Sequence, residues 1–592
     1  MSNKIDYSMS LATPNPLATS TVQKIALALG LTGLLILMLG VFNYTLPNSG
    51  TFLTIGILLL SGGIVGYAYD LYRGHPEGIK NNQVWQKSIS SRGFWGWATG
   101  VILTTFYIIL YFYPSYLGLG SDGKANSGVV ALFDPLSMVL KGQAASQWFV
   151  YGTLYTVAIL AFGYKFILKY RHNRYQIVRT ISVMFFQLGF AFLIPEIMSG
   201  LNNGGNGAIP FYDLKNMWPL NYYLFYDWNI KGLLNAGTIG LAMLIFGVVT
   251  IFIISPILTY FYGKRWYCSW VCGCGGLAET AGDSFRQLSS KKMSAWKFER
   301  WSIHVVLVFA ILMTVATVYS FLGKNSAIMI EKNQLILALS IVVVAIMAGV
   351  VILAAKKSTK IIAGLIGLLA LSNLRWGFLT SANEVSYGVP SQSFFTYFVV
   401  TIFALTLAVL FYFKRKAFDK DAKYTAISII VIIGGMLLMN HFMDAKHLFN
   451  IPHYKLQKTY GFLIGSVFSG VIGTGFYPIL GNRSWCRFGC PMAAMLGMQQ
   501  RLFSRFRIST NGGQCISCGN CSTYCEMGID VRSYAQKGEN IVRSSCVGCG
   551  ICSAVCPRGV LKLENGKEEN RINPNEILLG NDVDLMELVN NK

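Results

Sequence analysis

Apolar residues recur along this chain in long runs, separated by short polar and basic segments. Twelve of these runs approach the ~20 residues that a helix needs to cross the hydrocarbon core of a membrane. Their centres lie near Leu34, Leu60, Thr104, Val157, Gln187, Ile245, Phe309, Val344, Leu368, Phe403, Ile433 and Val471. The pattern therefore predicts an α-helical polytopic membrane protein of about twelve spans.

Basic residues are concentrated in alternate loops between these runs. The loops rich in Lys and Arg are 73–92, 165–179, 264–300, 356–360 and 414–423, whereas the loops between them are nearly neutral or mixed. Basic loops stay on the cytoplasmic side of a membrane. We therefore expect a multi-pass protein of the bacterial cytoplasmic membrane with both termini in the cytoplasm. The polar residues 1–21 lack the basic start and cleavage site of a signal peptide.

Composition agrees with this architecture. Of the 592 residues, 53% are hydrophobic and 13% are charged, and the mean hydropathy is +0.47. These values are typical of a membrane protein and not of a soluble enzyme of this length. The net charge of +23 raises the question of nucleic acid, but the basic residues lie in short clusters between apolar runs, as topology signals do. We therefore expect no nucleic-acid partner.

The last hundred residues contain two cysteine runs with the spacing of a bacterial two-cluster ferredoxin. Both read CxxCxxCxxxC, and they begin at Cys515 and at Cys546. In such a ferredoxin, three cysteines of one run and the last cysteine of the other hold one [4Fe-4S] cluster. The expected ligands are Cys515, Cys518, Cys521 and Cys556 for cluster I, and Cys546, Cys549, Cys552 and Cys525 for cluster II. Zinc sites and disulfide frameworks also use spaced cysteines, but zinc rarely uses tandem runs of this spacing.

One position departs from the usual ferredoxin pattern. Glu526 follows Cys525, where the pattern has proline. The change removes no ligand. We expect it to loosen the turn after Cys525 and to alter the potential of the cluster that this cysteine holds.

A second cysteine motif occurs after the sixth and again after the twelfth apolar run. The segments GKRWYCSWVCGC and GNRSWCRFGC align at a constant offset, which pairs Cys268 with Cys486 and Cys272 with Cys490. Each CxxxC pair is thus expected at the cytoplasmic exit of the last helix in a six-span half. Two such halves indicate a 6+6 repeat of the kind that transporter-like folds have.

The two pairs are suited to a shared metal site. Cysteines four residues apart lie on one face of a helix, so a pair from each half can present four thiolates to a metal or an additional cluster. This candidate quartet consists of Cys268, Cys272, Cys486 and Cys490, with Cys274 as a spare ligand. The alternative is that these small side chains only pack between helix ends. All thirteen cysteines belong to the four motifs, which favours a reducing, cytoplasmic-facing location.

The chain therefore divides into seven expected segments. They are a polar tail (1–21), a first six-span half (22–262), a cytoplasmic CxxxC segment (263–300), a second six-span half (301–480), a cytoplasmic CxxxCP segment (481–508), an α+β two-cluster ferredoxin domain (509–565) and a C-terminal tail (566–592). The outward loop 200–231 carries Trp218, Tyr222, Tyr223 and Trp228, which suit a membrane-interface belt or a docking surface for a partner.

The segment RSWCRFGCPMAAMLG, followed by the two ferredoxin runs, resembles the NosR and NapH group of membrane-bound ferredoxin-type electron carriers, which includes a cytochrome-oxidase assembly protein. The segment around Cys268 resembles it less closely, since Gly273 stands where the family has proline. The resemblance implies electron exchange among a quinone pool, cytoplasmic clusters and redox partner proteins or other subunits of a respiratory complex.

Three functions fit these observations. The first is a membrane oxidoreductase or electron-transfer subunit that relays electrons between a quinone pool or redox partner and the cytoplasmic-side clusters. The second is a maturation or metal-handling protein that keeps thiols or copper reduced. The third is a redox-driven transporter, against which the few intramembrane charges argue. The sequence has no Walker motif or dinucleotide fingerprint. Because every cysteine is placed on the cytoplasmic side, a quinone or a partner must complete any path across the membrane.

We expect the isolated protein to be brown, because each ferredoxin run completes a four-iron cluster. Iron analysis should give about eight iron atoms per chain from two clusters, and more if the quartet also binds iron. Zinc in place of iron would contradict the ferredoxin assignment.

We also expect tags at either terminus to be accessible only from the cytoplasm, because all the basic loops then fall on one side. Protease protection in oriented vesicles measures this. A C-terminus that faces outward would overturn the predicted topology.

Overall fold

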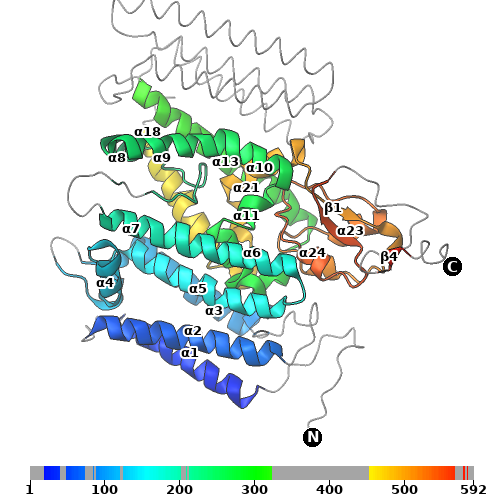
Figure 1. Cartoon of the computed structure of the whole chain (residues 1–592), viewed down its shortest axis with the longest axis horizontal. Helices are drawn as coiled ribbons and strands as arrows, with labels where there is room; N and C mark the ends of the chain where they lie inside the picture. Colours follow the sequence, from blue (N-terminus) through cyan, green and yellow to red (C-terminus); the bar gives the residue numbers. More distant parts are fainter. Residues whose placement is uncertain are drawn as a thin grey trace, which may run out of the picture.

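A computed structural model describes residues 19–40, 48–73, 85, 89–120, 124–201, 209, 212–322, 453–566, 578–579 and 583–584. Most of these residues are helical, and a small ferredoxin domain lies at one end of the helices (Figure 1). The predicted apolar runs near Val344, Leu368, Phe403 and Ile433 lie outside the described residues. The expected total of twelve spans and the 6+6 repeat therefore stay predictions.

Six helices within the described ranges are long and apolar enough to cross a membrane. They are α1 (Thr21–Leu39), α2 (Ser49–Arg73), α3 (Phe94–Phe112), α5 (Gln147–Lys169), the continuous helix of α6 (Arg174–Phe185), η6 (Phe186–Leu193) and α7 (Ile194–Leu201), and the continuous helix of α9 (Gly237–Val249), η7 (Thr250–Ile254) and α10 (Ser255–Tyr262). They coincide with the first six predicted runs, which are thereby confirmed as helices of spanning length.

The remaining helical elements include two further predicted runs and the short connecting elements. The run near Phe309 lies in α13 (Met293–Leu322), and the run near Val471 lies in α18 (His453–Tyr460) and η10 (Gly461–Ile472). The connecting elements are η4 (Ile89–Ser91), η5 (Pro114–Leu117), α4 (Gly128–Lys141), α8 (Asp227–Asn235), α11 (Arg265–Cys268), α12 (Gly273–Glu279), η8 (Ala281–Leu288), α19 (Tyr477–Leu480), α20 (Ser484–Phe488) and α21 (Pro491–Phe503).

The two CxxxC segments have the same local fold. Each follows a helix with a π-helical part, η7 or η10, and each begins with a glycine of positive φ, at +66° for Gly263 and +97° for Gly481. In each segment a short helix then leads to a cysteine that is the N-cap of the next helix, α12 or α21. The backbone hydrogen bonds also match, since the Cys272 N–H donates to the Tyr267 carbonyl at 2.8 Å and that of Cys490 to the Trp485 carbonyl at 3.0 Å. The sequence repeat is therefore a structural repeat in these segments.

The C-terminal region has the expected α+β fold. Strand β1 (Arg507–Thr510) pairs antiparallel with β2 (Leu561–Glu564), and Arg507 lies opposite Glu564. Between them lie η11 (Gly512–Gln514), α22 (Asn520–Thr523), α23 (Val531–Lys537) and α24 (Ile551–Ala554), and the short strands β3 (Leu578–Leu579) and β4 (Val583–Asp584) form a separate pair farther along the chain. Helices α22 and α24 each begin inside a cysteine run, after a glycine of positive φ.

The aromatic loop before α8 packs inward, contrary to the idea of an exposed docking surface. Trp218 Nε1 donates a hydrogen bond to Thr314 Oγ1 at 2.9 Å, and Tyr222 and Tyr223 pack against the core that holds the CxxxC cysteines. Of the four aromatic residues named above, only Trp228 is well exposed, at 63%. The loop is thus part of the interior that surrounds the cysteines.

Candidate iron-sulfur sites

A hollow in the ferredoxin domain is lined by all four cysteines that were expected to hold cluster I. Cys515, Cys518 and Cys521 come from the first run, and Cys556 comes from the second run. Arg532 and Pro557 also line it. The donor set and its enclosure therefore fit a [4Fe-4S] cluster.

The cysteines expected for cluster II also lie together. The thiol of Cys552 interacts electrostatically with those of Cys549, Cys546 and Cys525, and with Cys521 of the first set. Burial raises the pKa of Cys546 to about 11 and that of Cys549 to about 12. These thiols therefore keep their protons near neutral pH until a metal displaces them. The contact through Cys521 indicates that the two sets are adjacent.

The four cysteines of the quartet are buried in one core, each 5% or 6% exposed. The Cys490 thiol interacts electrostatically with those of Cys486, Cys268 and Cys272, so the two sequence-distant pairs lie near each other in this core. The side chain of Cys274 forms a hydrogen bond with that of Cys272. Soft thiol donors of this kind suit an iron-sulfur cluster, copper(I) or zinc.

Among the described residues, no three His, Cys, Asp or Glu side chains converge closely enough to bind a single metal ion. This holds for the ferredoxin cysteines as well as for the quartet. In a [4Fe-4S] cluster each cysteine binds a different iron atom, so the sulfur atoms need not meet at one point.

The first CxxxC segment turns back into the helix bundle. A Cβ atom on Gly273, the residue after Cys272, would lie 2.6 Å from Gln187 Oε1, 2.8 Å from Lys215 Nζ and 3.5 Å from Tyr155 Cε1. Tyr155 and Gln187 stand near the middles of their long helices. Cys272 therefore lies deeper than the helix-end position expected from the sequence.

The loop before α8 brings a cation to this depth. Lys215 is 8% exposed, and its Nζ donates a hydrogen bond to Gln187 Oε1 at 2.9 Å. Lys215 also interacts electrostatically with Cys272. Glycine at position 273 leaves room for this pair, since a Cβ atom there would collide with both side chains. No motif or spacing in the sequence indicated that Lys215 would lie beside the cysteines.

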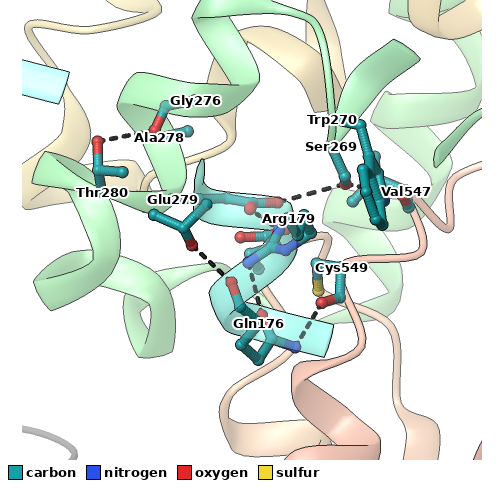
Figure 2. Close-up of polar contacts among 12 residues, drawn as sticks. Gln176, Arg179, Ser269, Trp270, Gly276, Ala278, Glu279, Thr280, Val547 and Cys549 are labelled. Atoms are coloured by element: carbon teal, nitrogen blue, oxygen red, sulfur yellow. Dashed lines mark hydrogen bonds and ion pairs between the residues drawn. The ribbon is translucent and has the colours of Figure 1, made fainter. Parts of the chain in front are cut away.

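Buried ion pairs join the quartet to the helices. Glu279, at the end of α12, pairs with Arg179 of α6 and with Arg483, which precedes α20. Arg179 Nη2 donates to Gln176 Oε1 at 2.7 Å, and Gln176 Nε2 donates to the Cys549 carbonyl at 2.8 Å (Figure 2). Polar contacts therefore run from the quartet segment to a cluster II cysteine.

Glu526 is the centre of a second set of ion pairs. Its carboxylate accepts a hydrogen bond from Arg286 Nη1 at 2.6 Å and lies 3.1 Å from Arg483 Nε. Burial by itself raises the pKa of Glu526, but the charges of Arg286, Arg483 and Arg179 outweigh burial and hold the pKa below its usual value. Glu526 is only 1% exposed. It is therefore a buried anion fixed by arginines, and not the loosened turn expected from the loss of proline.

A further acid anchors Arg286 to helix α5. Asp283 lies 3.2 Å from Arg286 Nε and 2.6 Å from Lys169 Nζ. Burial raises the pKa of Asp283, but Lys169, Lys165 and Arg286 outweigh it and keep the carboxyl ionised. Motif spacing does not predict these buried ion pairs. The glutamate at position 526, where the ferredoxin pattern has proline, was the one sequence feature that could have indicated them.

Comparisons with known proteins agree with this geometry. A 4Fe-4S dicluster domain family matches residues 514–561, and a 4Fe-4S binding domain family matches twice, at residues 244–294 and 462–509. The two repeated matches contain the two CxxxC pairs. Both cysteine systems thus lie in segments that match iron-sulfur domains. These matches are coarser than the resemblance to the NosR and NapH group and do not single it out.

A curated relative is similar over a short stretch. It is the putative electron transport protein YccM of Escherichia coli (strain K12), which is 39% identical over 55 residues. That stretch is 9% of this chain and 15% of the relative. No solved structure matches the chain.

We expect Gly273→Ala to perturb the quartet and to leave the ferredoxin clusters unchanged, because the new methyl group displaces the ends of Gln187 and Lys215. Overpacking of this kind costs about 1 kcal/mol. Gly189→Ala, in the same helix as Gln187, is the matched control, since a Cβ there meets nothing within 4 Å. Absorption and EPR spectra of the two variants measure the effect, and indistinguishable spectra would contradict the close approach.

Proposed function

We propose that this protein is an integral-membrane electron-transfer protein in which the ferredoxin domain and the buried quartet form one relay. Cys515, Cys518, Cys521 and Cys556 would hold cluster I, and Cys546, Cys549, Cys552 and Cys525 would hold cluster II. Cys268, Cys272, Cys486 and Cys490 would hold a third metal or iron-sulfur centre. When bound, such centres supply one-electron transfer. The name of the YccM protein and the iron-sulfur domain matches support this role.

The docking of the cluster II loop on the quartet segment is the observation that carries the proposal. Ser269, one residue after Cys268, donates its hydroxyl to the Val547 carbonyl at 2.9 Å (Figure 2). Tyr175 donates its hydroxyl to the Gly548 carbonyl at 2.8 Å. Direct hydrogen bonds from the quartet segment and from α6 thus hold the cluster II loop, which keeps the cluster II cysteines next to the quartet.

The depth of the quartet gives it access to partners within the membrane. The first CxxxC segment packs beside Tyr155 and Gln187 of two apolar helices, so a quinone or a membrane subunit is a suitable exchange partner. The ferredoxin domain would then exchange electrons with a redox partner in the cytoplasm, the side that carries the basic loops. Metal analysis separates this function from metal handling, because copper at the quartet would favour a maturation role.

We expect Cys268→Ser or Cys486→Ser to abolish electron transfer from the reduced ferredoxin domain to a quinone analogue. The two ferredoxin clusters should keep their EPR signals, since each already has four ligands. Cys274→Ser is the matched control and should retain transfer if Cys274 is only a spare ligand. Loss of a ferredoxin signal in either of the first two variants would show that the ligands are divided differently.

A further inference from the structure

An unbroken series of buried polar contacts connects a cluster II cysteine with a quartet cysteine. Arg286 Nη1 lies 4.0 Å from Cys549 Sγ and 2.6 Å from Glu526 Oε2. Glu526 Oε1 lies 3.1 Å from Arg483 Nε, and Arg483 Nη1 lies 3.6 Å from Cys486 Sγ. The three charged residues are each 1% exposed. We name this set, Arg286, Glu526 and Arg483, the charge bridge.

Each member of the charge bridge belongs to a different part of the chain. Arg286 lies in η8 after the first CxxxC pair, Arg483 directly precedes α20 with the second pair, and Glu526 belongs to the ferredoxin domain. An uncompensated buried charge is strongly destabilising. One carboxylate therefore locks three segments together at the place where the two cysteine systems meet.

Further contacts orient Arg483 toward the quartet. Its Nη1 also donates to the Cys268 carbonyl at 3.1 Å, and its Nη2 pairs with Glu279. The planar guanidinium thus reaches both CxxxC pairs and Glu526 at the same time. A lysine has a single point charge and cannot make this set of contacts.

We propose that Glu526 is a positioning residue that couples cluster II to the quartet through the charge bridge. Glu526 fixes the distance between the cluster II cysteines and the quartet, and its contacts with the two arginines offer a path for the transferred electron. Its negative charge also balances the arginine charge beside Cys549. One electron passes from the reduced to the oxidised side, and no bond or proton of the bridge changes. The inference rests on the proposed relay and extends it to residues that are not ligands.

Glu526→Gln tests the coupling, since it keeps the shape of the side chain and removes its charge. Removal of this one negative charge leaves Arg286 with Asp283 and Arg483 with Glu279, so the net charge beside cluster II becomes more positive. A more positive surrounding stabilises the reduced form of the cluster, so its midpoint potential should rise. After photoreduction of the full-length protein, transfer to the quartet should slow by about tenfold, equivalent to about 1.4 kcal/mol in the barrier. Magnetic coupling between the two centres in EPR spectra should weaken, while iron content stays unchanged.

Arg483→Lys separates position from charge. Lysine keeps the positive charge but lacks the several N–H donors of the planar guanidinium. Electron transfer should therefore slow, while the midpoint potential of cluster II stays near that of the wild type. Glu564→Gln is the matched control, because Glu564 pairs with Arg507 at 3.6 Å within the ferredoxin domain and belongs to neither the charge bridge nor a cysteine motif. Its transfer rate and potential should be those of the wild type.

The outcomes are distinct. Wild-type transfer rates, potential and magnetic coupling in both Glu526→Gln and Arg483→Lys would overturn the coupling role and leave the relay standing. Absence of a third centre in the wild-type protein would overturn the relay and the coupling together. If Glu526→Gln fails to assemble its clusters, the transfer rate, midpoint potential and magnetic coupling of Arg483→Lys test the coupling role instead.

Discussion

The pairing of buried arginines with the carboxylate of Glu526 constrains the rest of the structure. Arg286 and Arg483 are almost fully removed from water. Each pairs with Glu526 and with a second acid, Asp283 for Arg286 and Glu279 for Arg483. Removing such charges from water costs several kcal/mol per ion unless partners and hydrogen bonds compensate. The ferredoxin domain therefore cannot leave the helices without exposing or orphaning these charges. A contact of this kind favours one fixed arrangement of the domain over a flexible tether.

The duplicated CxxxC segment explains how a compact site forms between distant parts of the chain. Gly263 and Gly481 both reverse the chain with positive φ after a helix, and both lead to a cysteine at a helix N-cap. Because the two segments share one backbone path, they can approach each other with their cysteines facing a common centre. The repeat differs at its edges, since the sequence has Cys274 only in the first segment, and Lys215 interacts electrostatically with Cys272. The two sides of the site are thus similar in backbone and different in charge.

Two departures from family patterns have a common structural meaning. At position 273 glycine leaves space for Lys215 beside Cys272, and at position 526 glutamate binds two arginines beside Cys525. Each replaces an expected proline and each brings charged groups close to a cysteine. Reduction potentials of iron-sulfur centres depend on nearby charge and on hydrogen bonds to sulfur. We therefore expect the charges beside Gly273 and Glu526 to affect the reduction potentials of the centres that the neighbouring cysteines would hold.

The sequence by itself determined the features that depend on the spacing of cysteines and on the length of apolar runs. Cysteine spacing predicted the four cysteines that line one hollow, Cys515, Cys518, Cys521 and Cys556, and runs of apolar residues predicted six helices long enough to span a membrane, because both follow from spacing along the chain. Tertiary structure alone decided the depth of Cys272, the burial of Lys215 and the pairing of Glu526 with Arg286 and Arg483. These contacts join residues that lie between 28 and 240 positions apart in the sequence. Their stability comes from Coulomb attraction and hydrogen bonds that offset the cost of desolvation, and no local sequence pattern records these contacts.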